Sequence, residues 1–268
     1  MFIMRRKRAI LAILSESIAY SYIARMSHPQ QPNNSPQSPA VRRSDAGKIR
    51  LQPRDADGLT ILAEQYAAPY DLLAHRLNVT DDRLRGITAR WRDAGLAATG
   101  RLAQGPSWCW LTPAGMRQVG HQWAADPPPL ARLAHIRAVL AARIWMESGQ
   151  AWQAYRGWWR CERRIHAGRT AAGQPHRPDA EVIWPSIPGS PRAGETWALE
   201  VELTPKASMR TQQIISGLLA APYERVLYLC APAALPVVTH AANRFRPEQA
   251  ARMFIREISP AALMPKAA

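Results

Sequence analysis

The sequence of 268 residues predicts an α+β protein with two folded domains behind a basic extension. Three observations predict this. From about Gly58, helical periodicity marks three segments. After about residue 130, strand-like and helical segments alternate. Between these regions, residues 126–129 form the stiff spacer DPPP. We therefore place one domain over residues 57–125 and a second over residues 130–260.

The first 56 residues predict a disordered extension. Four basic residues at positions 5–8 precede an apolar run, as in a signal peptide, but Ser15, Glu16 and Ser17 interrupt that run early. Secretion is therefore the less favoured alternative. The stretch is also too short and too polar for stable membrane insertion. Residues 27–54 are rich in Pro, Gln, Asn and Ser, which is typical of a linker.

The charge and the cysteines indicate a partner and a compartment. The net charge of +15 predicts a polyanionic partner, and we expect DNA. Most basic residues are arginines, which suit bidentate phosphate contacts. Cys109, Cys161 and Cys230 lie far apart and match neither a zinc spacing nor a disulfide framework, so we expect a cytoplasmic protein. The sequence carries no signal for an oligomeric state.

The first domain predicts three helices followed by a strand pair. The first helix begins near Gly58 and the second near Pro69. The third follows the N-cap Thr80, whose acidic successors favour a helix start, and it ends at Gly95. Residues 96–112 then form two strand-like pieces around a turn between glycines. This order is that of a winged helix-turn-helix, a common DNA-binding module.

The third helix carries the candidate DNA contacts of this domain. Two alternatives stay open: these arginines form the solvated side of an amphipathic helix, or the module contacts proteins. The candidate DNA-binding residues here are Arg83, Arg85, Arg90 and Arg92.

The second domain predicts a mixed α/β sandwich. It opens with a strongly amphipathic helix over residues 130–147, and residues 208–258 alternate helix, strand, helix and strand. Between them, residues 152–177 interleave tryptophans with arginines, a pattern that suits nucleic-acid backbones and unpaired bases, or else places tryptophans in a core beneath solvated arginines. The candidate DNA-binding residues here are Arg156, Arg160, Arg163 and Arg164.

Acidic residues gather on two predicted strands, over residues 178–184 and 196–203. In the second strand, which reads as half-buried, Glu200 and Glu202 point to one side and the aliphatic residues to the other. Bare carboxylates are costly to bury, so a cation is expected beside them. Asp179 at the head of the first strand is a further oxygen ligand, and Mg²⁺ is the expected ion. The alternative is a surface hairpin with two solvated glutamates.

These residues carry a resemblance to known families. Pro178-Asp179 followed by Glu200-Val201-Glu202 resembles the motif of the PD-(D/E)xK nuclease superfamily, an aspartate after a proline and then an acidic-x-lysine strand. The run ALEVELTPKAS at residues 198–208, behind a winged-helix-like region, resembles the replication-relaxation family of actinobacterial plasmids and mobile elements. This second resemblance covers about residue 57 to the end.

The resemblance implies a restriction-endonuclease-like fold and a metal site. Asp179 and Glu200 would hold Mg²⁺, and Glu162 from a preceding helix and Glu202 would modulate or complete the shell of this catalytic site. Glu202 stands where the motif carries lysine, and Lys206, four residues further on, would reach back to stabilise the attacking water or the phosphate.

The function implied by the resemblance is that of a DNA-binding replication or transfer protein that is a Mg²⁺-dependent endonuclease. Other replication or transfer proteins would be its further partners. The alternatives are a catalytically inactive DNA-binding accessory factor, which the glutamate at the lysine position favours, and a transcriptional regulator.

Overall fold

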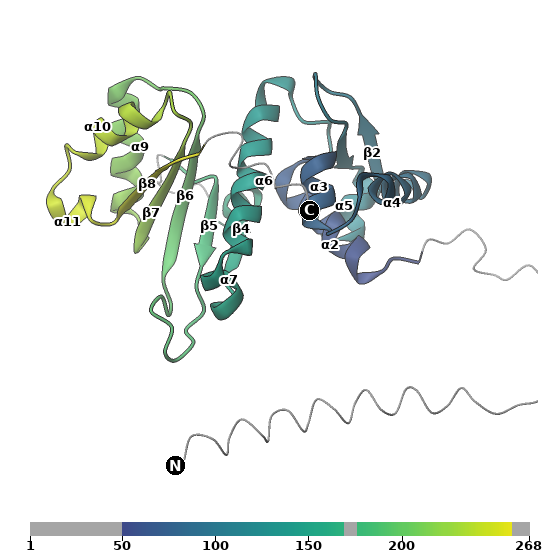
Figure 1. Ribbon diagram of the computed structural model, residues 1–268, viewed down its shortest axis with the longest axis horizontal. Coiled ribbons are helices and arrows are strands. Elements are labelled where there is room, and N and C mark those ends of the chain that lie inside the picture. The colour runs from purple at the N-terminus through teal and green to yellow at the C-terminus, as the bar shows by residue number, and fades with distance from the viewer. Residues whose placement is uncertain (1–49, 169–175, 259–268) are drawn as a thin grey trace, which may run out of the picture. The chain divides into compact units, whose positions relative to one another are not determined.

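The computed structural model describes residues 50–168 and 176–258, which form a mixed α and β structure (Figure 1). The predicted extension over residues 1–56 lies almost entirely outside these residues. Among the described helices, none combines the length and the apolar character that crossing a bilayer requires.

The first region combines helices with a small antiparallel sheet. Its elements are α2 (Pro53–Gln65), β1 (Ala68–Pro69), α3 (Tyr70–Arg76), α4 (Asp81–Asp93), β2 (Ala97–Gly100), β3 (Trp108–Leu111) and α5 (Pro113–Gln118). In the sheet, β3 lies between β1 and β2. The antiparallel register places Ala68 and Ala97 opposite Cys109 and Leu111, respectively.

Local capping signals set two of these helices as predicted. The Thr80 side chain accepts a hydrogen bond from the Arg83 amide at the start of α4. Gly95 follows the end of α4 with φ of 70°, a backbone angle that favours glycine. Thr112 accepts from the Gly115 amide and so caps α5, whose first residue is proline.

The first helix begins earlier than the sequence predicted. It starts at Pro53 rather than near Gly58 because the Asp55 side chain accepts from the Gln52 amide at 2.9 Å, which caps the helix. Asp55 is fully buried and also accepts from Trp91 Nε1 of α4 at 3.0 Å. The early start therefore depends on a partner far away in the sequence.

The second region is built on a five-stranded sheet. Its elements are the 3₁₀ turn η2 (Leu130–Arg132), α6 (Leu133–Ser148), α7 (Gln150–Tyr155), β4 (Trp158–Cys161), α8 (Glu162–Gly168), β5 (Ala180–Ile183), β6 (Thr196–Glu202), α9 (Ser208–Ala220), β7 (Arg225–Cys230), α10 (Leu235–Ala242), α11 (Pro247–Ala250) and β8 (Met253–Glu257). From α9 onward, helix, strand, helix and strand alternate as predicted for residues 208–258, with the short helix α11 added before β8.

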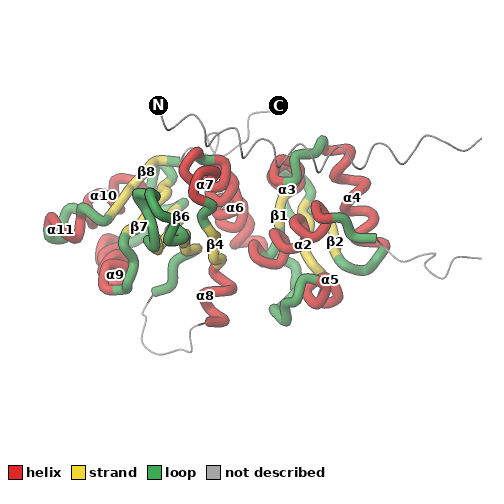
Figure 2. Tube along the Cα trace, turned by 90° about the horizontal axis from the view of Figure 1, so that it is seen from below, coloured by secondary structure: helices red, strands yellow, loops and turns green. Residues whose placement is uncertain are grey.

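The strand order is β4-β5-β6-β7-β8, and β6 is the central strand. The first three strands are antiparallel, whereas β6, β7 and β8 run parallel. Helix α6 covers one face and helices α9 and α10 cover the other (Figures 1 and 2). Residues of β6 alternate between the two cores as predicted. The strand is nevertheless buried on both faces rather than half-buried, because each face carries a helix.

Helix α6 differs from the amphipathic helix predicted over residues 130–147. Leu140 and Ala141 pack into the core of the first region, while Val139 and Ala142 pack against the five-stranded sheet. A helix held between two cores is apolar on two sides, so it does not show a single apolar stripe. Its one buried charge, Arg143, donates to Glu64 Oε2 of α2 at 2.6 Å.

Candidate active site

Asp179 and Glu200 are held side by side on neighbouring strands. The antiparallel register pairs Ala180 with Leu199, so Asp179, one residue before β5, comes level with Glu200 of β6. The Asp179 carboxylate accepts a hydrogen bond from the Val201 amide, with Oδ2 at 2.8 Å from the nitrogen. This bond fastens the aspartate to the strand that carries the glutamate.

Glu200 is buried in an environment that disfavours its charge. Its exposed fraction is 4%. Burial raises the pKa of Glu200 well above its ordinary value, and the charges of Asp179 and Glu202 raise it further, while Lys206 acts in the opposite direction. The Lys206 ammonium contacts Glu202 Oε2. Lys206 therefore reaches back from the segment before α9 to the acidic face of β6.

Two histidines contact the carboxylates. His135 of α6 places Nε2 at 2.9 Å from Asp179 Oδ1, and His176 places Nε2 at 2.8 Å from Glu200 Oε1. Burial opposes protonation of His135, but the hydrogen bond and charge of Asp179 outweigh it and raise the pKa of His135. Burial lowers the pKa of His176. The His176–Glu200 contact is therefore a hydrogen bond rather than a pair of full charges.

Sequence reasoning missed both histidines. His176 lies only three residues before Asp179, but a single loop histidine does not indicate a site residue, and His135 is far from both carboxylates in the sequence. The signal for His135 was its position as the single histidine of α6, near the start of that helix.

Tyr228 of β7 adds an unsatisfied hydroxyl to this face. The parallel register pairs Tyr228 with Glu200, and its side chain is 1% exposed. Within the described parts of the chain its hydroxyl has no hydrogen-bond partner. Burial raises the pKa of Tyr228 well above its ordinary value, with added contributions from Glu200 and Glu202. Buried polar groups normally have partners, so the face is incomplete as it stands.

Glu162, which the resemblance places in the metal shell, is paired with a cation and a hydroxyl. Its carboxylate accepts from Arg132 Nη2 at 3.0 Å and from the Tyr66 hydroxyl at 3.1 Å. It lines a cavity of about 20 Å³ together with Asp179 and His135, but a cation already neutralises it. Over residues 50–168 and 176–258, no group of three or more His, Cys, Asp or Glu side chains is placed to hold a metal ion.

The candidate arginines of residues 152–177, where tryptophans and arginines interleave, mostly pair with acceptors inside the protein. Arg160 Nη1 lies 2.7 Å from Glu181 Oε2, and Arg164 Nε lies 2.9 Å from Glu64 Oε1. Arg163 is buried and donates to two backbone carbonyls, those of Ala63 and Ala124. Its guanidinium is therefore used in packing rather than presented to DNA. Arg156, which follows α7, is the exposed member of the four.

The arginines of α4 remain more accessible. Arg83 is exposed, and Arg85 is 67% exposed beside Asp82 at 2.6 Å. Arg92 is 57% exposed near Asp93. Arg90 differs because its Nη2 lies 3.2 Å from the buried Asp55. Arg83, Arg85 and Arg92 thus keep the geometry of surface contacts, while Arg90 is also part of the structure.

Comparisons with known proteins add little. No family model matches the chain, and no curated protein matches it. Among solved structures, it has a weak similarity to the restriction endonuclease FokI bound to DNA, with a TM-score of 0.27 and 10% sequence identity. The match covers 76% of this chain and 42% of the FokI chain. Neither the fold nor the function of this chain follows from a similarity this weak.

Proposed function

We propose that this chain is a DNA-binding protein that cuts DNA phosphodiesters with Mg²⁺, using Asp179 and Glu200 to hold the ion. The observation that carries the proposal is the placement of the two carboxylates side by side, with Glu200 buried and short of cationic partners. Mg²⁺ in phosphoryl-transfer sites is commonly held by one or two carboxylates, with waters and substrate phosphates completing the shell. A pair of carboxylates is therefore sufficient, and a third is not required.

The surroundings fit a cation. The unpartnered Tyr228 hydroxyl and the raised pKa of Glu200 both favour a further cation on this face, in addition to Lys206. When bound, Mg²⁺ would supply charge stabilisation at the phosphate and lower the pKa of a coordinated water. Asp179 is pre-positioned by the Val201 amide, so it would keep its orientation.

Lys206 would take the role that the nuclease motif gives to a lysine two residues after the glutamate. Its ammonium contacts Glu202 and acts electrostatically on Glu200, so it stands at the edge of the carboxylate face. From there it would orient the attacking water or stabilise the phosphate. Glu202 would hold the lysine in place rather than bind the ion.

We also propose a fold for each of the two regions. Three helices followed by an antiparallel strand pair support a winged helix, with α4 as the helix that meets DNA. A mixed sheet between helix layers, with the acids on its central strand, supports a PD-(D/E)xK-like domain. A role in plasmid or mobile-element replication or transfer rests on the resemblance of residues 198–208 alone.

A nicking assay on supercoiled plasmid tests the proposal. Wild type should nick the plasmid with Mg²⁺ and not with EDTA. Asp179→Asn and Glu200→Gln should each lose nicking by at least about a hundredfold, because each removes a charged metal ligand. Glu248→Gln, in an exposed carboxylate of α11, should match wild type. Equal nicking by wild type and Asp179→Asn would rule out the assignment.

A second candidate function is a non-catalytic DNA-binding factor. Glu202 at the lysine position of the motif favours it, since it places an extra carboxylate where phosphate would approach. This alternative predicts salt-sensitive DNA binding without Mg²⁺-dependent nicking. The variant Lys206→Gln separates the two candidate functions. If Lys206 serves catalysis, the variant should nick plasmid much less than wild type. If the protein does not cut DNA, the variant should bind DNA with nearly the wild-type affinity.

A further inference from the structure

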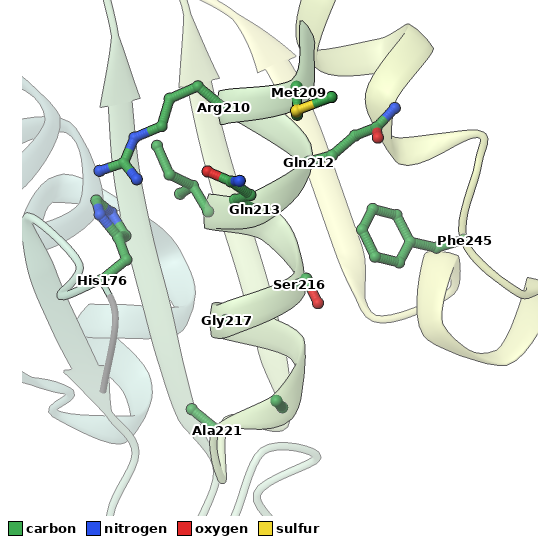
Figure 3. A pocket seen from close by; sticks show the side chains of 11 residues that line it. His176, Met209, Arg210, Gln212, Gln213, Ser216, Gly217, Ala221 and Phe245 are labelled. Carbon is green, nitrogen blue, oxygen red and sulfur yellow. The ribbon is translucent and has the colours of Figure 1, made fainter. Parts of the chain in front are cut away.

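A groove runs along the outer face of α9 and meets the carboxylate site at His176 (Figure 3). His176 both lines the groove and contacts Glu200 Oε1 at 2.8 Å. In Figure 3 the Arg210 side chain extends from α9 toward His176, with Gln213 close by. The groove has a volume of about 750 Å³, which is in the range of pockets that hold ligands of nucleotide size.

The charge of the groove is opposite to that of the site it meets. Among its lining residues, all in the described part of the chain, Arg210 supplies a positive charge and there is no Asp or Glu. Arg210 is exposed and forms no ion pair with any residue that the structure describes. An anionic ligand would therefore meet a free guanidinium here, while the neighbouring carboxylates would be approached only through a cation.

The walls of the groove suit a chain with flat rings. Ser216, Gly217 and Ala220 form a floor of small side chains along α9, which lets a ligand backbone come close. Phe245 faces the groove from the segment after α10 (Figure 3). With its oxygen turned toward Arg244, the Gln212 amide accepts from Arg244 Nη1 at 2.7 Å. This bond fixes the polar edge beside the aromatic ring.

We infer that the α9 groove binds a single strand of DNA, so that unpaired DNA is preferred over continuous duplex as the substrate. Arg210 would contact a phosphate and Phe245 would stack on a base. A base in a duplex is stacked and paired inside the helix and offers no free ring to Phe245, whereas an unpaired base does. The inference rests on the proposed function for the identity of the cut bond, but strand binding can be measured without cutting.

Fluorescence anisotropy in EDTA tests the inference directly. The probes are a fluorescein-labelled single-stranded oligonucleotide and the blunt duplex of the same sequence. Wild type should bind the single strand more tightly than the duplex. Ser216→Trp, which fills the groove from an exposed position, and Arg210→Gln should each weaken single-strand binding by about tenfold, the order expected for one lost stacking or phosphate contact. Duplex affinity should stay within about twofold because it depends on α4.

Arg256→Gln is the matched control, since Arg256 is an exposed arginine on β8 outside the groove. It should behave as wild type with both probes, and all variants should share the wild-type melting temperature. Unchanged single-strand affinity in Ser216→Trp and Arg210→Gln would overturn the inference. If plasmid nicking fails while these variants still lose single-strand binding, the cutting function falls and the groove assignment stands. If nicking persists and the affinities do not change, only the groove assignment falls.

Discussion

Two buried glutamates point to the same side of the five-stranded sheet, yet their surroundings are opposite. Glu181 of β5 lies opposite Ala198 in the register, on the face that α9 covers. Its side chain is 1% exposed, and it is well satisfied: Arg160 Nη1 and the Tyr223 hydroxyl each lie 2.7 Å from one of its oxygens. Glu181 thus has its own cation and its own donor.

Glu200, two residues beyond Ala198 on β6, is almost as deeply buried but has no such cation of its own. His176 donates or accepts a single hydrogen bond, and the charges of Asp179 and Glu202 raise the pKa of Glu200 while those of Lys206 and His135 lower it. The hydroxyl of Tyr228, its neighbour on β7, has no partner among the residues described.

The difference shows that burial alone does not identify a functional carboxylate. A buried carboxylate with a cation and a donor is a structural element, whereas one that faces further carboxylates remains short of positive charge. The following predictions test whether this distinction holds.

The largest expected stability effect is at Glu181. Glu181→Leu should lower the free energy of unfolding by about 2–3 kcal/mol, because it removes the acceptor of the half-buried Arg160 and of the buried Tyr223 hydroxyl. Glu200→Gln should lie within about 1 kcal/mol of wild type or be more stable, because it removes like-charge repulsion. Urea denaturation of both variants measures the contrast. Equal destabilisation would mean that the two glutamates play the same role.

A pH series sharpens the same comparison. Because burial and neighbouring carboxylates raise the pKa of Glu200, the folded protein keeps a proton that the unfolded chain has released at the same pH. The free energy of unfolding should therefore fall as pH rises from the ordinary carboxyl value of 4.5 to the raised value. Glu200→Gln should show a smaller fall over that window in urea titrations with EDTA present. Parallel curves for the two proteins would contradict a raised pKa.

The distinction between charges that are paired within the protein and charges that are accessible to a ligand also applies to α4. Arg90→Ala should cost about 1 kcal/mol of stability, because it removes a partner of the buried Asp55. Arg83→Ala should leave stability unchanged and weaken duplex binding, with a shallower salt dependence. Thermal unfolding and anisotropy at several salt concentrations check both. A loss of stability in Arg83→Ala, or none in Arg90→Ala, would reverse their assigned roles.

The smallest expected effect is at Gly86, in the middle of α4. A Cβ added there would meet nothing within 4 Å, so Gly86→Ala should raise the free energy of unfolding by about 0.5–1 kcal/mol. If DNA approaches this exposed face of the helix closely, Gly86→Gln should weaken duplex binding while Gly86→Ala does so less. Unchanged affinity in both variants would place the DNA on another face.

Much of the fold could be predicted because its signals are local. Thr80 and Gly95 mark the ends of α4, and the apolar run over residues 225–230 marks a strand with helices on both sides. Elements that depend on distant partners could not be predicted. The start of α2 needs Trp91 to satisfy Asp55, and β4 is hidden in a run of tryptophans and arginines that has no strand period.

The candidate site divides in the same way. Asp179 and Glu200 could be paired from sequence, because adjacent strands with acids at their ends leave few arrangements. His135 could not, because its place depends on α6 packing against the sheet, and that packing is set by two cores at once. The surroundings of Glu162 could not be predicted either, because the sequence does not reveal that Arg132 lies within hydrogen-bonding distance of it.

Binding of Mn²⁺, followed by electron paramagnetic resonance, tests the central claim most directly because it needs neither DNA nor turnover. Wild type and Glu248→Gln should each bind Mn²⁺ at one site per chain, and Asp179→Asn and Glu200→Gln should lose that site while keeping the wild-type melting temperature or a higher one. Mn²⁺ binding that is the same in all four proteins, or absent from wild type, would contradict a metal site built on these two carboxylates.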